Sequence, residues 1–142
     1  MALSIEAARR AVLAEVQPLP TEDVAVQDAL GRVLAEDVAA ATDVPAFANS
    51  AMDGFAVRTG AAGRTLRIVG ESRAGAPAAM TLGDGEAIRI STGAAIPEGA
   101  DGVLQIERVT VDGDEVTLEE DVDPGRNLRP AGDDLRAGDL IL

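Results

Sequence analysis

Residues 49–58 read Asn-Ser-Ala-Met-Asp-Gly-Phe-Ala-Val-Arg (NSAMDGFAVR), and Asp53-Gly54 lies between two short apolar runs. Both residues of an Asp-Gly pair tolerate the positive φ angles of a tight two-residue turn. Because the strand-like run Phe55-Ala56-Val57 follows, the local pattern predicts a β-hairpin centred on Asp53-Gly54. The alternative is a loop that presents the Asp53 carboxylate for chemistry. The residues by themselves favour the hairpin and leave the alternative open.

From about Pro45 onward, short apolar runs are separated by glycines, which predicts a β-rich unit. Within it we expect a hairpin with a four-residue loop at Asp112–Glu115, which pairs Val111 with Val116 and keeps the apolar side chains on one face. The apolar residues before this hairpin are out of phase with it. A β-bulge near Glu107-Arg108 is the predicted cause.

Before Pro45 the chain is expected to be partly helical. Ser4 can cap a helix that ends before Pro18 and whose apolar face packs on another element. Thr21–Val26 and Val33–Ala40 are predicted as short strands, separated by a helical turn at Asp28–Arg32 that a glycine closes. The expected fold class is therefore α+β and mostly β.

Composition excludes several classes of function. The chain has 142 residues, a formal net charge of −13 and no Cys or His, and its only aromatic residues are Phe47 and Phe55. Nucleic acid and anionic membranes are poor partners for such a chain. Zinc sites and nucleophiles that depend on His or Cys are impossible, so a metal site has to use oxygen ligands, which suits Mg²⁺. Without a signal core or a transmembrane run, we expect a cytoplasmic protein.

Two further segments carry candidate site residues. Ser91-Thr92-Gly93-Ala94 follows a predicted strand, and its hydroxyl and N–H groups can hold a phosphate or satisfy a Ser/Thr turn. Asp133-Asp134 follows Arg126 and Arg129 in an irregular segment. These arginines can contact an anion while an aspartate serves a metal or catalysis, or the segment is a solvated linker. The residues alone favour the structural interpretation in both cases.

Taken together, four motifs closely resemble the molybdopterin molybdenumtransferase family, which also supplies the C-terminal part of gephyrin. In chain order these are Ala29–Val38, Val44–Val57, Arg89–Ala94 with Pro97–Asp101, and Arg126–Arg129 with Gly132–Asp134. The resemblance implies hydrolysis of adenylylated molybdopterin with Mg²⁺ and insertion of molybdate to form the molybdenum cofactor. It assigns roles to six residues: Asp53 and Asp134 as catalytic, Asp53 also as metal ligand, and Ser50, Thr92, Arg126 and Arg129 as substrate-binding.

The resemblance also implies that the chain is an N-terminal fragment of a longer protein. Its expected parts are residues 1–44 of an elongated domain, an inserted β-barrel-like domain at 45–133, and a return segment at 134–142. The family's active site lies at a homodimer interface, so the fragment alone is expected to lack activity. The remaining alternative is a non-enzymatic scaffold of the gephyrin kind or a standalone interaction module.

Overall fold

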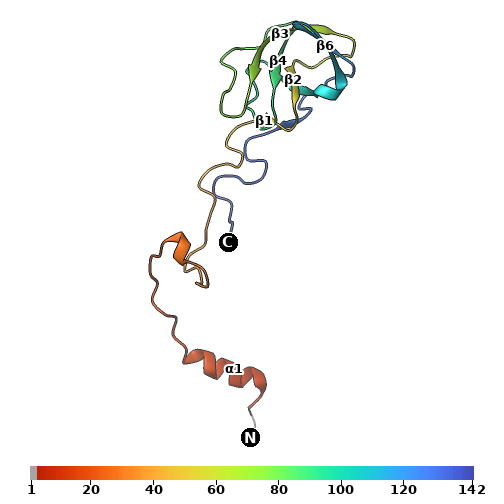
Figure 1. Ribbon diagram of the computed structural model, residues 1–142. Helices are drawn as coiled ribbons and strands as arrows, with labels where there is room; N and C mark the ends of the chain where they lie inside the picture. Colours follow the sequence, from red (N-terminus) through yellow and green to blue (C-terminus); the bar gives the residue numbers. More distant parts are fainter. Residues whose placement is uncertain (1–2) are drawn as a thin grey trace. The chain divides into compact units, whose positions relative to one another are not determined.

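The computed structural model describes residues 3–142, which form two compact units (Figure 1). The first unit extends to Asp37 and the second runs from Val38 to Leu142. All strands of the described chain lie in the second unit. The predicted domain ranges 1–44, 45–133 and 134–142 stay a prediction.

The helix α1 spans Ile5–Ala14 and begins as expected at Ser4. The Ser4 hydroxyl accepts a hydrogen bond from the Ala7 N–H at 3.2 Å, which satisfies one of the free donors of the first turn. Glu6 adds a negative charge at the same end, where the helix dipole favours it. No residue of α1 is buried, so the expected packing of its apolar face finds no partner among residues 3–142.

The two strands predicted between α1 and the β-rich unit are wrong. Thr21–Val26 leads into a 3₁₀ turn, η1, at Val26–Asp28, and Gly31 then adopts a positive φ of 82°. Val33–Ala40 forms a single isolated bridge, from Ala39 to Leu140. Apolar alternation favours an extended chain, but a strand also needs a hydrogen-bonded neighbour along its length. No segment of the described residues pairs with Thr21–Val26, and Val33–Ala40 has a neighbour only at its last three residues.

Two extended segments, residues 38–44 and 135–142, run side by side beneath the sheet. The N–H groups of Val38, Ala40 and Val44 donate to the carbonyls of Leu142, Asp139 and Leu135 at 3.0, 2.8 and 2.8 Å. Figure 1 shows these two segments rising together toward the strands. The segment that leads into the sheet and the segment that leaves it are therefore hydrogen-bonded to each other.

A six-stranded sheet forms the body of the second unit (Figure 1). Its order is β5-β2-β4-β3-β7-β6, and the pairs are antiparallel except β3–β4. The strands are β2 (Gly54–Val57), β3 (Thr65–Ser72), β4 (Glu86–Ile90), β5 (Gly102–Gln105), β6 (Val109–Asp112) and β7 (Glu115–Leu118). The expected α+β, mostly β class with a barrel-like unit is confirmed.

The sheet must curl, because a very short connection joins its two edges. β5 and β6 lie at opposite ends of the strand order, and the 3₁₀ turn η2 at Ile106–Arg108 is all that separates them in sequence. Five strand spacings of a flat sheet amount to about 24 Å. The chain from Gln105 to Val109 spans at most about 14 Å. The two edges therefore approach each other, and the sheet forms a half-barrel.

The curled sheet buries both of its faces. On the inner face, Phe55 of β2 and Leu104 of β5 pack in one cluster with Val116 of β7, which joins strands that are not neighbours. On the outer face, Ala56 and Ile88 pack with residues of the connecting loops. This explains why all four residues of β2 are buried, although a strand with one solvated face would alternate.

The β6–β7 hairpin has the predicted register. Val111 pairs with Val116, as expected, but Asp112 and Glu115 also pair. The loop is therefore Gly113-Asp114, two residues shorter than predicted, with Gly113 at φ 60° as in a type II′ turn. The break expected near Glu107-Arg108 is the 3₁₀ turn η2 rather than a β-bulge, since it transfers the chain from one sheet edge to the other.

The hairpin predicted at Asp53-Gly54 is wrong. The short strand β1 (Asn49–Ser50) pairs with β8 (Leu128–Arg129), whereas β2 pairs with β4 and β5. Gly54 is instead the first residue of β2. A Cβ atom at this position would lie 2.0 Å from the Leu104 carbonyl oxygen. Glycine is required here for close approach of two strands, and no tight turn is involved.

We expect Gly54→Ala to lower the free energy of unfolding by about 3 kcal/mol or more, because the added methyl group would force β2 and β5 apart. Urea denaturation followed by circular dichroism measures the loss. Gly63→Ala is the matched control: Gly63 has a φ of 82° and open space around it. Its cost is that of the left-handed backbone alone, about 1–2 kcal/mol. Equal losses for the two variants would show that the close approach at Gly54 is unimportant.

Candidate functional site

Asp53 and Thr92 meet at one end of the sheet. Gly54, at the start of β2, pairs with Ile90, at the end of β4, so the residues just outside both strands come together. The Asp53 Oδ1 atom accepts hydrogen bonds from the Thr92 N–H at 2.7 Å and from the Thr92 hydroxyl at 3.2 Å. Both residues are exposed. The carboxylate is thus held in a fixed orientation while remaining accessible to solvent.

Ser50 anchors the loop that carries Asp53. The residue is 1% exposed, and its hydroxyl donates to the Met52 carbonyl at 2.6 Å and accepts from the Met52 N–H at 3.3 Å. Its backbone bonds the loop after β4: its N–H donates to the Ala94 carbonyl at 3.0 Å, and its carbonyl accepts from the Gly93 N–H at 2.8 Å. The side chain predicted to bind substrate is occupied in shaping this loop, and its substrate role stays a prediction.

Arg129 and Asp134 form an ion pair in the neighbouring segment. Arg129 lies on β8 opposite Asn49, and its guanidinium donates to Asp134 Oδ1 at 2.7 Å and to Asp133 Oδ2 at 3.3 Å. The hydrogen bond to Asp134, followed by that to Asp133, raises the pKa of Arg129 above its ordinary value. Two of the predicted site residues therefore neutralise each other in this structure.

Arg126 is also paired with an acidic residue. Its guanidinium donates to a Glu120 carboxylate oxygen and to the Asp121 carbonyl, and its side chain is 26% exposed. Chiefly through the Arg126 hydrogen bond, and with a further contribution from the Arg108 charge, the pKa of Glu120 lies below its ordinary value. Arg126 therefore braces the loop before β8, and contact with an anion would require it to leave these partners.

Asn127 belongs to the Arg126–Arg129 motif, but the sequence analysis gave it no role of its own. Its φ of 54° places it in the left-handed region, which asparagine tolerates better than most residues. Its carbonyl accepts the Ala51 N–H at 2.9 Å, and its side-chain amide donates to the Val103 carbonyl at 2.9 Å. Asn127 thus connects β5 to the Asp53 loop. An asparagine two residues after a glycine in an irregular segment was the available signal.

The motifs with predicted roles converge on one region. Ser50 and Asp53 contact the loop at residues 92–94, Arg129 pairs through the backbone with Asn49, and Asp134 binds Arg129. Apart from the bond between Arg129 and Asp134, which are five positions apart, these hydrogen bonds join residues 39 or more positions apart in sequence. Arg126 is the exception, since its guanidinium turns toward Glu120 and Asp121.

This region offers some, but not all, of the ligands that a metal ion needs. No group of three or more acidic side chains placed to hold a metal occurs within residues 3–142. Both hydrogen bonds to the Asp53 carboxylate fall on Oδ1, so Oδ2 is available as a single ligand. Mg²⁺ commonly takes one or two carboxylates and completes its shell with water and substrate phosphates. The chain thus offers one ligand of such an ion rather than a complete site.

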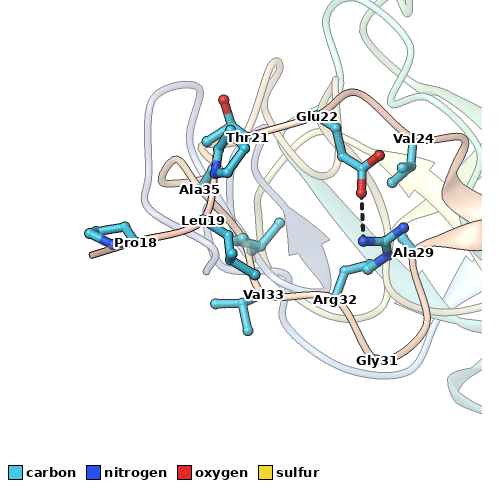
Figure 2. Close-up of a pocket in the computed structure, with 12 residues that line it drawn as sticks. Pro18, Leu19, Thr21, Glu22, Val24, Ala29, Gly31, Arg32, Val33 and Ala35 are labelled. Atoms are coloured by element: carbon cyan, nitrogen blue, oxygen red, sulfur yellow. Dashed lines mark ion pairs between the residues drawn. The ribbon is translucent and has the colours of Figure 1, made fainter. Parts of the chain in front are cut away.

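A cavity of about 720 Å³ lies in the first unit and involves none of the predicted site residues (Figure 2). Residues 18–22, 24, 29 and 31–35 line it, and its walls are mostly apolar. Figure 2 shows the ion pair that joins its two sides, between Glu22 and Arg32 at 2.6 Å. The cavity has no cluster of catalytic groups. Across residues 3–142, no helix is long and apolar enough to cross a membrane.

Comparison with known proteins identifies relatives over nearly the whole chain. Residues 3–142 match the family model of the MoeA N-terminal region, domain I and II. A molybdopterin molybdenumtransferase from Haemophilus influenzae is 40% identical over 144 residues, which cover 99% of this chain and 36% of the relative. The chain spans about a third of the length of the curated relatives it matches.

Solved structures agree with these sequence relatives. A crystal structure of the molybdopterin biosynthesis MoeA protein from Pyrococcus horikoshii OT3 has a TM-score of 0.80 and 36% identity, and the match covers 85% of this chain and 34% of that chain. A second crystal structure of a Pyrococcus MoeA protein has a TM-score of 0.81 and 33% identity, with coverage of 99% and 38%. The mostly β fold with one helix is therefore shared with them.

Glu120→Gln tests the pairing of Arg126 through its pH dependence. The folded-state pKa of Glu120 lies below its unfolded value of 4.5, so the pair stabilises the fold above that pH, and this stabilisation is lost as the pH falls through the folded-state pKa. We expect the variant to be less stable than wild type at pH 7, and the difference to shrink as the pH is lowered below 4.5. Urea denaturation over a series of pH values measures this difference.

The control is Glu115→Gln, because Glu115 is an exposed carboxylate that enters no ion pair with any described residue. It should show no such pH-dependent difference. A pH-independent effect of Glu120→Gln would contradict the assigned ion pair.

Proposed function

The chain belongs to the family of the MoeA N-terminal region, and from this premise we propose that it contributes to a molybdopterin molybdenumtransferase. The proposed reaction is hydrolysis of adenylylated molybdopterin coupled to insertion of molybdate, which forms the molybdenum cofactor. Molybdopterin molybdenumtransferase is the name of the relatives that share 32–40% identity with the chain. The activity belongs to proteins about three times as long, so this chain supplies one part of the site.

The observation that best supports the proposal is the contact between Asp53 and Thr92. These residues come from separate motifs 39 positions apart, and two hydrogen bonds join them at the rim of the sheet. Asp53 is exposed and forms no ion pair with any of residues 3–142, so two hydrogen bonds orient its carboxylate while no arginine neutralises it. An oriented and accessible carboxylate is suited to work on a bound substrate.

The proposed roles follow from this geometry. Thr92 holds Oδ1, which directs Oδ2 toward solvent, where it can accept a proton from an attacking water or bind Mg²⁺. A bound Mg²⁺ would supply positive charge to the phosphate oxygens of the substrate. Ser50 holds the loop in place, and Asp134 is proposed to act from the far side of the same region through Arg129.

Charge supports a composite site. The chain carries −13, and a surface of this charge repels molybdate and nucleotide phosphates. Arg126 and Arg129 are already paired with acidic residues. We therefore propose that most positive contacts to the substrate come from another part of the protein, and that the site forms in a homodimer in the cytoplasm. The β-rich unit of one subunit would then face the nucleotide-binding domain of the other.

A chimera tests the proposal. In it, this chain replaces the matched part of the Haemophilus influenzae relative, and a strain lacking its own transferase reports cofactor formation through a molybdoenzyme. We expect the chimera to restore activity, Asp53→Asn to abolish most of it, and the isolated chain to restore none. Asparagine keeps the size of the side chain and the acceptor for Thr92, so stability should change by less than about 1 kcal/mol.

Asp84→Asn is the matched control, since it removes the same charge from an exposed aspartate that contacts Arg58. Its activity should equal that of the unmodified chimera. A folded chimera without activity would contradict the transferase proposal and favour a scaffold role. An active chimera that tolerates Asp53→Asn would leave the family function in place but remove Asp53 from catalysis.

Substitutions at Thr92 distinguish the contribution of its hydroxyl from that of its backbone N–H, since both donate to Asp53. In the same chimera, Thr92→Ser retains both hydrogen bonds to Asp53 and should keep most of the activity. Thr92→Ala retains only the N–H bond at 2.7 Å, and we expect activity to fall by about tenfold. Assays of cofactor formation at matched protein levels measure the difference. If serine and alanine have equal activities, the hydroxyl is a local turn contact.

A further inference from the structure

Arg89 lies near the strand ends that carry Asp53 and Thr92. It forms no ion pair within the described residues, and the proposed function gives it no role. It is the fourth residue of β4 and pairs directly with Phe55 of β2. Thr92 follows it by three residues and Asp53 precedes Phe55 by two. At about 3.3 Å per residue along a strand, the Cα atoms of Arg89 and Thr92 are at most about 10 Å apart. Arg89 therefore lies near the same end of the sheet as Asp53 and Thr92.

The guanidinium of Arg89 is uncommitted. Of the arginines in residues 3–142, four are partly buried: Arg64, Arg89, Arg126 and Arg129. Arg64 donates to two carbonyl groups, while Arg126 and Arg129 pair with carboxylates. Arg89 alone among these four neither donates a side-chain hydrogen bond nor forms an ion pair within the described chain. Its N–H groups are therefore free to donate to water or to a ligand.

The guanidinium of Arg89 lies over the ring of Phe55. The Arg89 Cζ atom lies 4.9 Å from the centre of the Phe55 ring, and that ring is fully buried. Stacking on an aromatic face uses the flat side of a guanidinium and leaves the N–H groups on its edge free to donate. A planar pair of donors of this kind matches the oxygen atoms of a tetrahedral anion.

The acidic residue opposite Arg89 on the neighbouring strand already binds another arginine. Glu71 of β3 pairs with Arg89 across the parallel strands, but its carboxylate binds Arg73 at 2.8 Å. That hydrogen bond, ahead of the charges of Arg73 and Arg89, lowers the pKa of Glu71. Because Arg73 already matches the charge of Glu71, Arg89 leaves a local positive charge at the rim of a strongly acidic protein.

We propose that Arg89 binds a tetrahedral oxyanion, so that the anion lies next to Asp53 and Thr92. The ligand class is a phosphate group of a nucleotide or molybdate, which share charge, size and geometry. This inference rests on the proposed function and adds to it a cationic substrate contact supplied by the β-rich unit itself. Arg126 and Arg129, to which the family resemblance assigns substrate binding, have their guanidinium groups engaged elsewhere.

Nuclear magnetic resonance titration of the 142-residue chain tests the proposal. Sodium molybdate and inorganic pyrophosphate are added in separate experiments, and the Arg89 Nε–Hε and Thr92 amide resonances are followed. We expect both to shift in a saturable manner with at least one anion at millimolar concentration, and the more tightly bound anion identifies the source of the oxyanion. Arg89→Gln should weaken binding by about tenfold, and Arg89→Lys should weaken it less, because a lysine retains the charge but loses the planar pair of donors.

Arg67→Gln is the matched control. Arg67 pairs with Glu86 at the opposite end of β4, so the variant removes the same charge from the same sheet far from Asp53. Binding should be unchanged in Arg67→Gln, and thermal unfolding of each variant verifies that it is folded. Equal weakening in the Arg67 and Arg89 variants would indicate a general charge effect and overturn the proposal, as would the absence of saturable shifts at Arg89. These outcomes are independent of cofactor formation by the chimera, which tests the proposed function separately.

Discussion

The contact between Gly54 and Leu104 is the constraint on which the second unit depends. With no side chain at Gly54, β2 approaches β5 closely while it also pairs with β4 on its other side. Residues of β2 therefore enter both the inner and the outer apolar cluster. The same glycine sets the start of the strand, which leaves Asp53 just outside it and within hydrogen-bond reach of Thr92.

This arrangement separates stability from chemistry over a very short distance. Phe55, the second residue of β2, is fully buried, whereas Asp53, just before the strand, is exposed. Strand ends are well suited to hold functional groups, because the rigid sheet positions the backbone while the side chain just beyond it remains free. Thr92 lies two residues beyond the end of β4, so two adjacent strand ends present a hydroxyl and a carboxylate to each other.

Electrostatics give the region a consistent pattern. Acidic residues dominate the chain, and most of its partly buried arginines serve as braces: Arg126 holds the loop before β8, and Arg129 holds the segment with Asp134. These pairs consume the positive charge that the sequence offers near the motifs. Arg89 differs because its guanidinium contacts an aromatic ring rather than a carboxylate. This contact leaves the N–H donors of Arg89 free. A polyanionic substrate would still need cations from outside this unit, in agreement with a chain that covers about a third of its relatives.

The sequence by itself determined the features that depend on neighbouring residues or on composition. These are the Ser4 cap of α1, the β-rich class after Pro45, the register that pairs Val111 with Val116, and the absence of His and Cys chemistry. Its motifs also indicated the family. Only the tertiary structure decided that Asp53-Gly54 is a strand entry and that Thr21–Val26 has no strand partner. It also decided that Arg126 and Arg129 are paired while Arg89 is not. The physical reason is that a local pattern encodes backbone preference, whereas β2 pairs with residues 32 or more positions away in β4 and β5. The partner of each arginine likewise depends on which carboxylate the folded loop places against it.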